Sequence, residues 1–269
     1  MMYLIVGRSG SGKDYLAAKM EKRGLKVVKS YSTRPRRTEN EDSHIFVSKE
    51  EADAITDKIA TTEINGFEYF ATKRQVEECD IYIIDPHGLY ELVENMPGQI
   101  FTVIYVFVED DMTRKLKAIN RASNVIKEEE TFDKRNNAER GQFDEFEAKL
   151  RSAYNEQTNS VDAIFGENVA GAIMYANKYS EEEVDRFIDE IMRQRKYHLF
   201  AKHIAELAGE KDILTNENGS FQIKSKGEEK SVSADYIASI LTRNSEQMQN
   251  ILTRLLDDSD VFDQMMDIH

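Results

Sequence analysis

The stretch YLIVGRSGSGKD, residues 3–14, places an apolar run directly before a glycine-rich segment. The apolar run predicts a buried strand, and the residues after the glycines predict a helix. Glycines at 7, 10 and 12 let the backbone turn tightly and aim successive N–H groups at phosphate oxygens, and the helix adds its positive N-terminal end. A glycine-rich turn without a ligand is the alternative, but strand, loop and helix occur in the order that a phosphate-binding loop requires. The segment therefore predicts a phosphate-binding loop made of Gly7, Ser9, Gly10, Ser11, Gly12, Lys13 and Asp14.

The last two residues of this loop differ in how well they fit the usual pattern. Lys13 can reach the β- and γ-phosphates of a bound nucleotide. Asp14 stands where the pattern has a serine or threonine whose hydroxyl ligates magnesium. Asp14 has two interpretations. It is an acidic residue in the first turn of a helix, where negative charge is favourable, or it is an oxygen ligand that contacts Mg²⁺ directly or through water.

Short apolar runs alternate with helix-like segments over most of the chain. Continuously apolar strands are typical of a parallel sheet that is buried on both faces, so the alternation predicts an α/β fold with a parallel sheet between helices. A fifth strand is expected at 163–165 or at 173–176, and the second is preferred because a helix-like segment opening on Ser180 follows it. The other expected strands are Tyr3–Val6, Leu25–Val28, Ile81–Asp85 and Phe101–Val108, and the expected helices are Lys13–Arg23, Gly88–Asn95, Asp110–Arg121 and Phe132–Glu156.

Two segments interrupt this alternation, and long excursions from a compact sheet are usually functional. The first, residues 30–75, is polar and begins with a basic run, and the second, residues 122–135, is expected to form a lid. With the sheet they make up an expected domain over residues 1–194. Residues 195–269 are expected to form a small α+β or mainly helical region, with an amphipathic helix, a hairpin around NENGS and three helices that open on serines. Its expected role is a packed accessory lobe, with a homodimer interface or a protein-binding surface as alternatives.

Composition limits the partners and the compartment. The net charge of −14 argues against general nucleic-acid binding, which depends on clustered Lys and Arg. The single cysteine, Cys79, excludes an internal disulfide framework and suits a reducing compartment. The longest apolar run, residues 100–108, is too short to cross a bilayer as a helix. We therefore expect a cytoplasmic protein that binds no membrane.

The segment SYSTRPRRTENEDSHIFV, residues 30–47, resembles the acceptor-binding segment of the guanylate kinase family. Two guanidinium groups can hold a monophosphate dianion bidentately, although a solvated basic turn is the alternative interpretation of STRPRR. The later segment TEINGFEYFAT, residues 62–72, resembles the tyrosine-containing acceptor segment of the same family. The resemblance implies an acceptor site made of Ser30, Arg34, Arg37, His44, Glu63, Tyr69 and Asp85.

The segment IYIIDPHG, residues 81–88, also resembles this family but departs from it where the base is recognised. Ile83 replaces an aspartate that contacts guanine in the family, and Ala71 replaces a hydroxyl residue. Asp85 matches the family and has two interpretations. It orients magnesium through water, or it caps the helix that follows.

Two helix-like segments, EDDMTRKLKAINRASN and FDKRNNAER, resemble the lid region of the family. The resemblance implies catalytic roles for Arg121 and Arg135, which would act together with Lys13 on the transferred phosphoryl group. Arg114 and Arg140 are expected to be ordinary arginines on a helix surface.

The resemblance covers about residues 3–193 and implies an enzyme that uses ATP and Mg²⁺ to phosphorylate a nucleoside monophosphate, with GMP or dGMP as the first expectation. The GKD ending of the loop is similar to that of some phage-type deoxynucleoside monophosphate kinases. Ile83 and Ala71 motivate a second hypothesis, a kinase for another (deoxy)nucleoside monophosphate or small phosphorylated acceptor. A non-catalytic binding module is the third hypothesis, but the retained GSGK sequence favours an enzyme.

Overall fold

The computed structural model describes residues 1–36, 39–64, 66–120, 125–155, 161–207, 213–215, 221–225 and 228–232. The chain divides into two compact units, Met1–Ser180 with two sheets and Glu181–His269 with one sheet among the described residues. Within the described ranges, no helix combines the length and the apolar character needed to cross a membrane.

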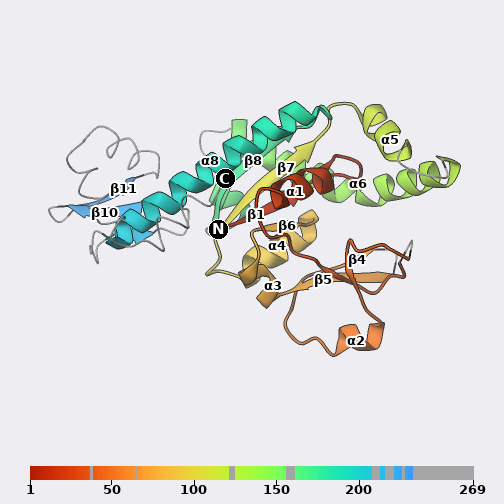
Figure 1. Cartoon of the computed structure of the whole chain (residues 1–269), viewed down its shortest axis with the longest axis horizontal. Helices are drawn as coiled ribbons and strands as arrows, with labels where there is room; N and C mark the ends of the chain where they lie inside the picture. Colours follow the sequence, from red (N-terminus) through yellow and green to blue (C-terminus); the bar gives the residue numbers. More distant parts are fainter. Residues whose placement is uncertain are drawn as a thin grey trace. The chain divides into compact units, whose positions relative to one another are not determined.

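A four-stranded parallel sheet forms the centre of the first unit (Figure 1). Its strand order is β6–β1–β7–β8, and each neighbouring pair is parallel. The expected α/β class is therefore confirmed. The strands are β1 (Met2–Val6), β6 (Ile81–Ile83), β7 (Phe101–Phe107) and β8 (Val169–Ala176).

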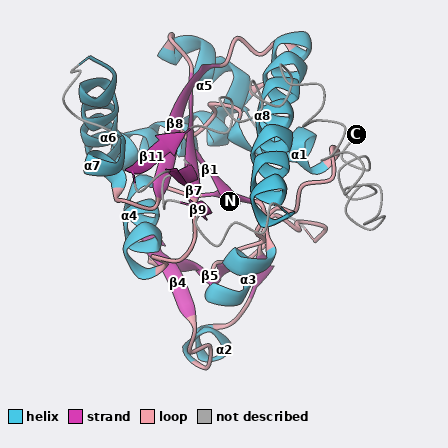
Figure 2. Cartoon of the chain, turned by 90° about the vertical axis from the view of Figure 1, so that its left-hand side faces the viewer, coloured by secondary structure: helices cyan, strands magenta, loops and turns pink. Residues whose placement is uncertain are grey.

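Helices cover both faces of this sheet, which explains why its strands are apolar on both sides. α1 (Lys13–Glu21) packs on one face, where Leu16, Ala17 and Met20 are buried. Figure 2 shows α1 on one side of the sheet and α4, α6 and α7 on the other. The second face carries the main core, in which Met2, Leu4 and Val6 of β1 join side chains of these helices. The three helices on this side are α4 (Pro86–Asn95), α6 (Val125–Asn155) and α7 (Val161–Phe165). α5 (Asp111–Ile119) packs against α6.

Residues 30–75 form a second sheet with the order β3–β2–β5–β4, so most of the first excursion is regular structure. Its strands are β2 (Tyr31–Ser32), β3 (Ile45–Phe46), β4 (Lys58–Ile64) and β5 (Phe67–Thr72). The helices α2 (Lys49–Asp53) and α3 (Lys73–Glu78) each begin at a capping box, in which Ser48 and Thr72 bond the backbone of the first turn.

Three expected elements differ from the structure. The strand expected at Leu25–Val28 is reduced to one bridge, between Val27 and Ile81, because its neighbour β6 is only three residues long. The helix expected from Phe132 begins at Val125, so most of the expected lid is helical. Of the two candidates for the last strand, 173–176 is confirmed within β8, whereas 163–165 belongs to α7.

The second unit contains α8 (Glu181–Leu207) and a three-stranded antiparallel sheet. The pairing of β9 (Ile213–Thr215) with β10 (Phe221–Ser225) confirms the expected hairpin strands, and β11 (Glu228–Val232) completes the sheet. The expected boundary at residue 194 falls inside α8, which continues without interruption. The turn of the hairpin and the three helices expected toward the C-terminus lie outside the described residues.

Candidate active site

The glycine-rich loop connects the carboxyl end of β1 to the first turn of α1, as the sequence predicts. Gly10 and Gly12 have φ angles of 81° and 95°, in the left-handed region that glycine adopts without strain. Packing also excludes side chains, because a Cβ atom at Gly12 would lie 2.2 Å from Nδ2 of Asn177. A Cβ atom at Gly7 would lie 2.5 Å from Oγ of Ser11 and from the carbonyl oxygen of Val106. Gly12 is therefore required both by its backbone conformation and by a close contact, Gly10 mainly by its conformation and Gly7 by close contacts.

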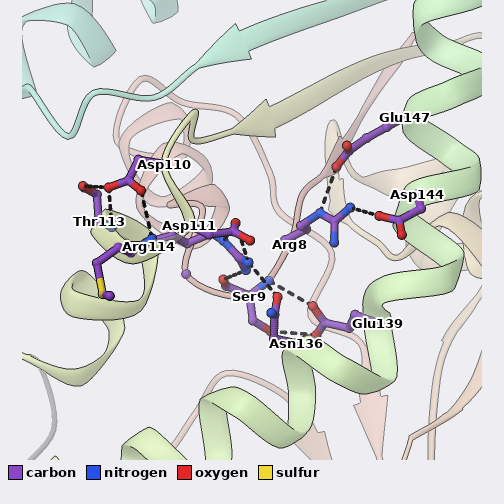
Figure 3. A network of polar contacts seen from close by, with 12 residues as sticks. Arg8, Ser9, Asp110, Asp111, Thr113, Arg114, Asn136, Glu139, Asp144 and Glu147 are labelled. Carbon is purple, nitrogen blue, oxygen red and sulfur yellow. Dashed lines mark hydrogen bonds and ion pairs between the residues drawn. The ribbon is translucent and has the colours of Figure 1, made fainter.

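Carboxylates of α6 accept hydrogen bonds from the first residues of the loop (Figure 3). Arg8 donates from Nε to Glu147 at 2.8 Å and from Nη2 to Asp144 at 2.6 Å. Ser9 donates to Glu139 twice, from its backbone N–H at 3.1 Å and from its hydroxyl at 2.6 Å. Arg8 and Ser9 of the loop are thus both held by α6, which is distant from them in the sequence.

Arg114 of α5 forms a second support, and the expectation of a surface arginine is wrong here. Its side chain is 1% exposed. Nη1 donates to the carbonyl oxygen of Ser9 at 2.7 Å, while Nη2 donates to Asn136 at 2.6 Å and to Asp111 at 2.9 Å. The guanidinium group also lies 5.1 Å from the ring centroid of Phe132. Arg140, by contrast, is exposed as expected.

The segment after β8 forms a third support. Asn177 is buried and donates from Nδ2 to the carbonyl oxygen of Ser11 at 2.7 Å. The hydroxyl of Tyr179 donates to the carbonyl oxygen of Gly10, also at 2.7 Å. Nζ of Lys117 lies 5.1 Å from the centroid of the Tyr179 ring. The loop is therefore bonded from α5, from α6 and from the residues that follow β8.

The first turn of α1 has no side-chain cap, because its N-cap residue is Gly12. Within the described ranges, the backbone N–H groups of Gly10, Gly12, Lys13 and Asp14 donate no hydrogen bond. In the same part of the chain, the hydroxyl of Ser11 is buried without a hydrogen-bond partner. Unbonded N–H groups at a loop and a helix N-terminus fit a phosphate chain.

Lys13 and Asp14 are the first two residues of α1. The Lys13 side chain is half-buried and Asp14 is exposed, and neither forms an ion pair with any described residue. Asp14 therefore fits both of its interpretations, as a charge near the helix N-terminus and as an oxygen ligand for Mg²⁺.

Asp85 caps α4, as one of its two interpretations expects. Its Oδ1 accepts hydrogen bonds from the N–H groups of His87 and Gly88 and from Nε2 of Gln142 on α6. Its second carboxylate oxygen makes no hydrogen bond or ion pair with the described residues, so the cap uses only one of the two oxygens. No group of three His, Cys, Asp or Glu side chains that could hold a metal occurs within the described ranges.

The second sheet brings several of the expected acceptor residues together. The Ser30 hydroxyl and Nδ1 of His44 are 2.9 Å apart, and the His44 and Tyr69 rings meet edge to face with centroids 5.5 Å apart. Tyr69 lies opposite Ser32 in the strand pairing, so its side chain shares a face with Ser32 and Ser30. Ser30, His44 and Tyr69, which are distant in the sequence, thus form one polar cluster in which Ser30 is buried.

Arg34 is buried and is already paired. It forms a bidentate contact with Glu41, with Nη1 at 2.9 Å and Nη2 at 2.5 Å from the two carboxylate oxygens. Hydrogen bonding to Glu41 raises the pKa of Arg34 above its ordinary value. Nε of Arg34 is buried and has no partner within the described ranges, and the guanidinium group lies 4.8 Å from the centroid of Phe46. Nε is therefore a donor of this guanidinium group that has no acceptor among the described residues.

Glu63 is separated from this group by the pleat of the sheet. The pairing Thr62–Tyr69 and Glu63–Glu68 in β4 and β5 puts Glu63 on the face opposite Tyr69. Glu63 is also exposed. Ala71 is buried and Ile83 is half-buried, so neither supplies a polar side chain for a base.

The expected lid arginines are described only in part. Arg135 is half-buried on α6, next to Asn136, which accepts from Arg114. Arg121 and Arg37 lie outside the described residues.

Several residues that hold this site were not singled out by sequence reasoning. Arg8, Glu139, Asn177, Tyr179 and Glu41 act through partners that are distant in the sequence, or, for Glu41, through a pairing inside an irregular segment. The sequence contained one local signal for Glu41: the basic run at residues 34–37 predicts an acidic partner nearby.

The chain was compared with protein families, curated proteins and solved structures. No protein-family model matches the chain, and no curated protein matches it. A match among solved structures is the crystal structure of guanylate kinase from Anaplasma phagocytophilum, with 16% identity and a TM-score of 0.40. The match covers 70% of this chain and 82% of that chain. At this identity and TM-score the likeness leaves the activity of the chain open.

Proposed function

We propose that this chain is a nucleoside monophosphate kinase that transfers the γ-phosphate of ATP to a purine (deoxy)nucleoside monophosphate, with GMP or dGMP favoured. The observation that supports it most is the glycine loop. Its N–H groups at Gly10, Gly12, Lys13 and Asp14 have no acceptor among the described residues, and with the adjacent Lys13 they suit a phosphate chain. A second polar surface, with Arg34, Ser30, His44 and Tyr69, lies in the same compact unit and suits a monophosphate. A donor site and an acceptor site are the two parts that phosphoryl transfer requires.

In this proposal the protein acts by positioning and by neutralising charge, because phosphoryl transfer needs little covalent help. The loop N–H groups and Lys13 hold the β- and γ-phosphates. Arg121 and Arg135 stabilise the charge of the transferred group from the lid side. Arg34 and Arg37 hold the acceptor phosphate, with Ser30, His44 and Tyr69 beside them.

Magnesium, when bound, would neutralise part of the negative charge of the nucleotide phosphates, in addition to the charge balanced by Lys13 and the arginines. Asp14 and Asp85 are the carboxylates that would hold it, directly or through water. Asp85 can do so with its second oxygen while its first oxygen still caps α4.

A second candidate activity is phosphorylation of a different (deoxy)nucleoside monophosphate or small phosphorylated acceptor. The apolar side chains of Ala71 and Ile83 favour it, because they cannot hydrogen-bond the edge of guanine. A site that reads a base by hydrogen bonds loses this discrimination when the polar partner is replaced.

The test is an ADP-release assay with ATP, Mg²⁺ and each of GMP, dGMP, AMP, CMP, dTMP and UMP. Turnover that is fastest with GMP or dGMP supports the first proposal, and turnover only with another acceptor supports the second. Absence of turnover with all six acceptors would contradict the nucleoside monophosphate kinase proposal. Specific binding of a protein partner in that case would favour a non-catalytic module.

A further inference from the structure

Three successive carbonyl groups of the glycine loop are each bonded by a different side chain. The oxygen of Ser9 accepts from Arg114, that of Gly10 from the hydroxyl of Tyr179, and that of Ser11 from Asn177, each at 2.7 Å. The carbonyls on either side are bonded by backbone, since Arg8 accepts from the N–H of Ser11 and Gly12 accepts from that of Leu16. All carbonyls from residue 8 to residue 12 are therefore fixed in direction.

Fixing a carbonyl also fixes the next N–H group, because the two point in opposite directions across a planar trans peptide. The chain contains no cis peptide within the described residues, so this applies to the whole loop. Arg114 on the Ser9 oxygen thus directs the N–H of Gly10, and Asn177 on the Ser11 oxygen directs that of Gly12. These two N–H groups belong to the set without an acceptor among the described residues. Tyr179 fixes the peptide between them.

We propose that Arg114, Tyr179 and Asn177 are positioning residues that hold the loop N–H groups ready for a nucleotide phosphate chain. The inference rests on the proposed function, since it assumes that the loop binds phosphate. Donors that are directed before binding lose less freedom when the ligand arrives, so they raise affinity without touching it. The name "carbonyl clamp" is used below for these three side chains.

The backbone around Tyr179 agrees with a positioning role. Its φ angle is 57°, an unusual conformation for a bulky residue. Two hydrogen bonds hold it there, from its N–H to Oδ1 of Asn177 at 2.8 Å and from its hydroxyl to the Gly10 oxygen. Asn177 is thus bonded to Tyr179 as well as to the loop, and the close approach of its amide to Gly12 leaves no room for another side chain there. Such strained residues persist where the surroundings hold them.

The first test replaces Tyr179 by Phe, which removes one hydroxyl and keeps the ring beside Lys117. Loss of one hydrogen bond predicts about a two- to tenfold weaker Kd for MgATP and for inorganic tripolyphosphate, by calorimetry. The KM for the monophosphate acceptor should stay unchanged. Tyr90→Phe is the matched control, because Tyr90 stacks on Phe165 of α7 and its hydroxyl has no partner among the described residues. Unchanged affinity in Tyr179→Phe would overturn the inference. So would a loss confined to ATP and absent with tripolyphosphate, since the hydroxyl would then serve the nucleoside.

The second test replaces Asn177 by Asp, which keeps the size of the side chain but puts a carboxylate oxygen against the Ser11 carbonyl. We expect a larger loss of MgATP affinity than in Tyr179→Phe. The control is Asn168→Asp, because Asn168 is also buried and donates to backbone carbonyls, those of Val93 and Met96. Both variants should unfold at lower temperature, but only Asn177→Asp should bind nucleotide more weakly at a temperature where both are folded. Equal affinities in the two variants would show a structural role only.

These tests separate the carbonyl clamp from the proposed function. A wild-type protein that binds neither MgATP nor tripolyphosphate would contradict both. A wild-type protein that binds them, with variants of equal affinity, would contradict the clamp alone.

Discussion

Gly12 combines a left-handed backbone with a contact that excludes any side chain. We predict that Gly12→Ala greatly weakens nucleotide binding, because its φ of 95° is strained for alanine and its Cβ would overlap Asn177. Gly98→Ala is the control, since Gly98 has nothing within 4 Å of its Cβ position and no positive φ. The Kd for MgADP by fluorescence titration measures the effect. Equal affinity in the two variants would contradict the loop geometry.

Lys13 is the residue on which the donor site depends most. Lys13→Met should abolish ADP production while the far-UV circular dichroism and the unfolding midpoint stay near those of the wild type, because the side chain makes no ion pair with the described residues. Lys22→Met, at an exposed lysine that follows α1, should retain activity. Unchanged turnover in Lys13→Met would mean that the loop is not the donor site.

Arg34 decides the assignment of the acceptor surface. Arg34→Ala should raise the KM for the monophosphate about ten- to a hundredfold, the effect of losing a charge-assisted hydrogen bond worth roughly 1.5–3 kcal/mol. The KM for ATP should change little. Arg74→Ala is the control, because Arg74 is an exposed arginine whose partner is Glu78 on the same helix. An effect on the ATP KM alone would place Arg34 in the donor site.

At the scale of elements, α6 joins the glycine loop to the central sheet. Glu147 accepts from Arg8 of the loop and from the hydroxyl of Tyr105 on β7, and Gln142 bonds Asp85 at the start of α4. Phe143 and Phe146 of the same helix are buried in the core. The helix therefore contacts both the glycine loop and Asp85, the N-cap residue of α4.

This role predicts a loss of stability when the Glu147 contacts are weakened. Glu147→Gln should lower the free energy of unfolding by about 1–3 kcal/mol, because a partly buried charged hydrogen-bond network loses its charge. Urea unfolding of the full chain measures it. Glu145→Gln should lower it by less than about 0.5 kcal/mol, since that exposed residue forms a surface ion pair with Lys149 one turn away. Similar losses in both variants would contradict the special role of Glu147.

At the scale of the whole molecule, the excess of acidic residues restricts the partners. With 36 basic and 50 acidic residues, the chain should show no measurable affinity for duplex DNA at physiological ionic strength. Fluorescence anisotropy with a labelled duplex measures this, and a basic protein of similar size serves as the positive control. Salt-dependent binding by the full chain would show a basic surface that the composition does not predict.

The sequence was sufficient where structure depends on neighbours along the chain. The order of apolar strand, glycines and helix predicted β1, the loop and α1, and the preferred last strand was confirmed. It failed at Leu25–Val28, because strand length depends on the neighbour. It also failed at Val125, because residues 125–131 continue the helix although most of them are exposed and polar, so no apolar pattern marks them. It also misjudged Arg114, because charge and spacing do not reveal burial.

The sequence by itself determined the α/β class and the glycine-rich loop between a strand and a helix, because these features follow from local backbone preferences. The acceptor candidates Ser30, Arg34, His44 and Tyr69 came from the resemblance of their segments to a known family. Only the tertiary structure decided that Glu63 faces away from Tyr69, that Glu41 neutralises Arg34, and that Arg114, Tyr179 and Asn177 bond the loop carbonyls. The physical reason is that strand pairing sets which face a side chain occupies, and long-range hydrogen bonds join groups up to 169 residues apart.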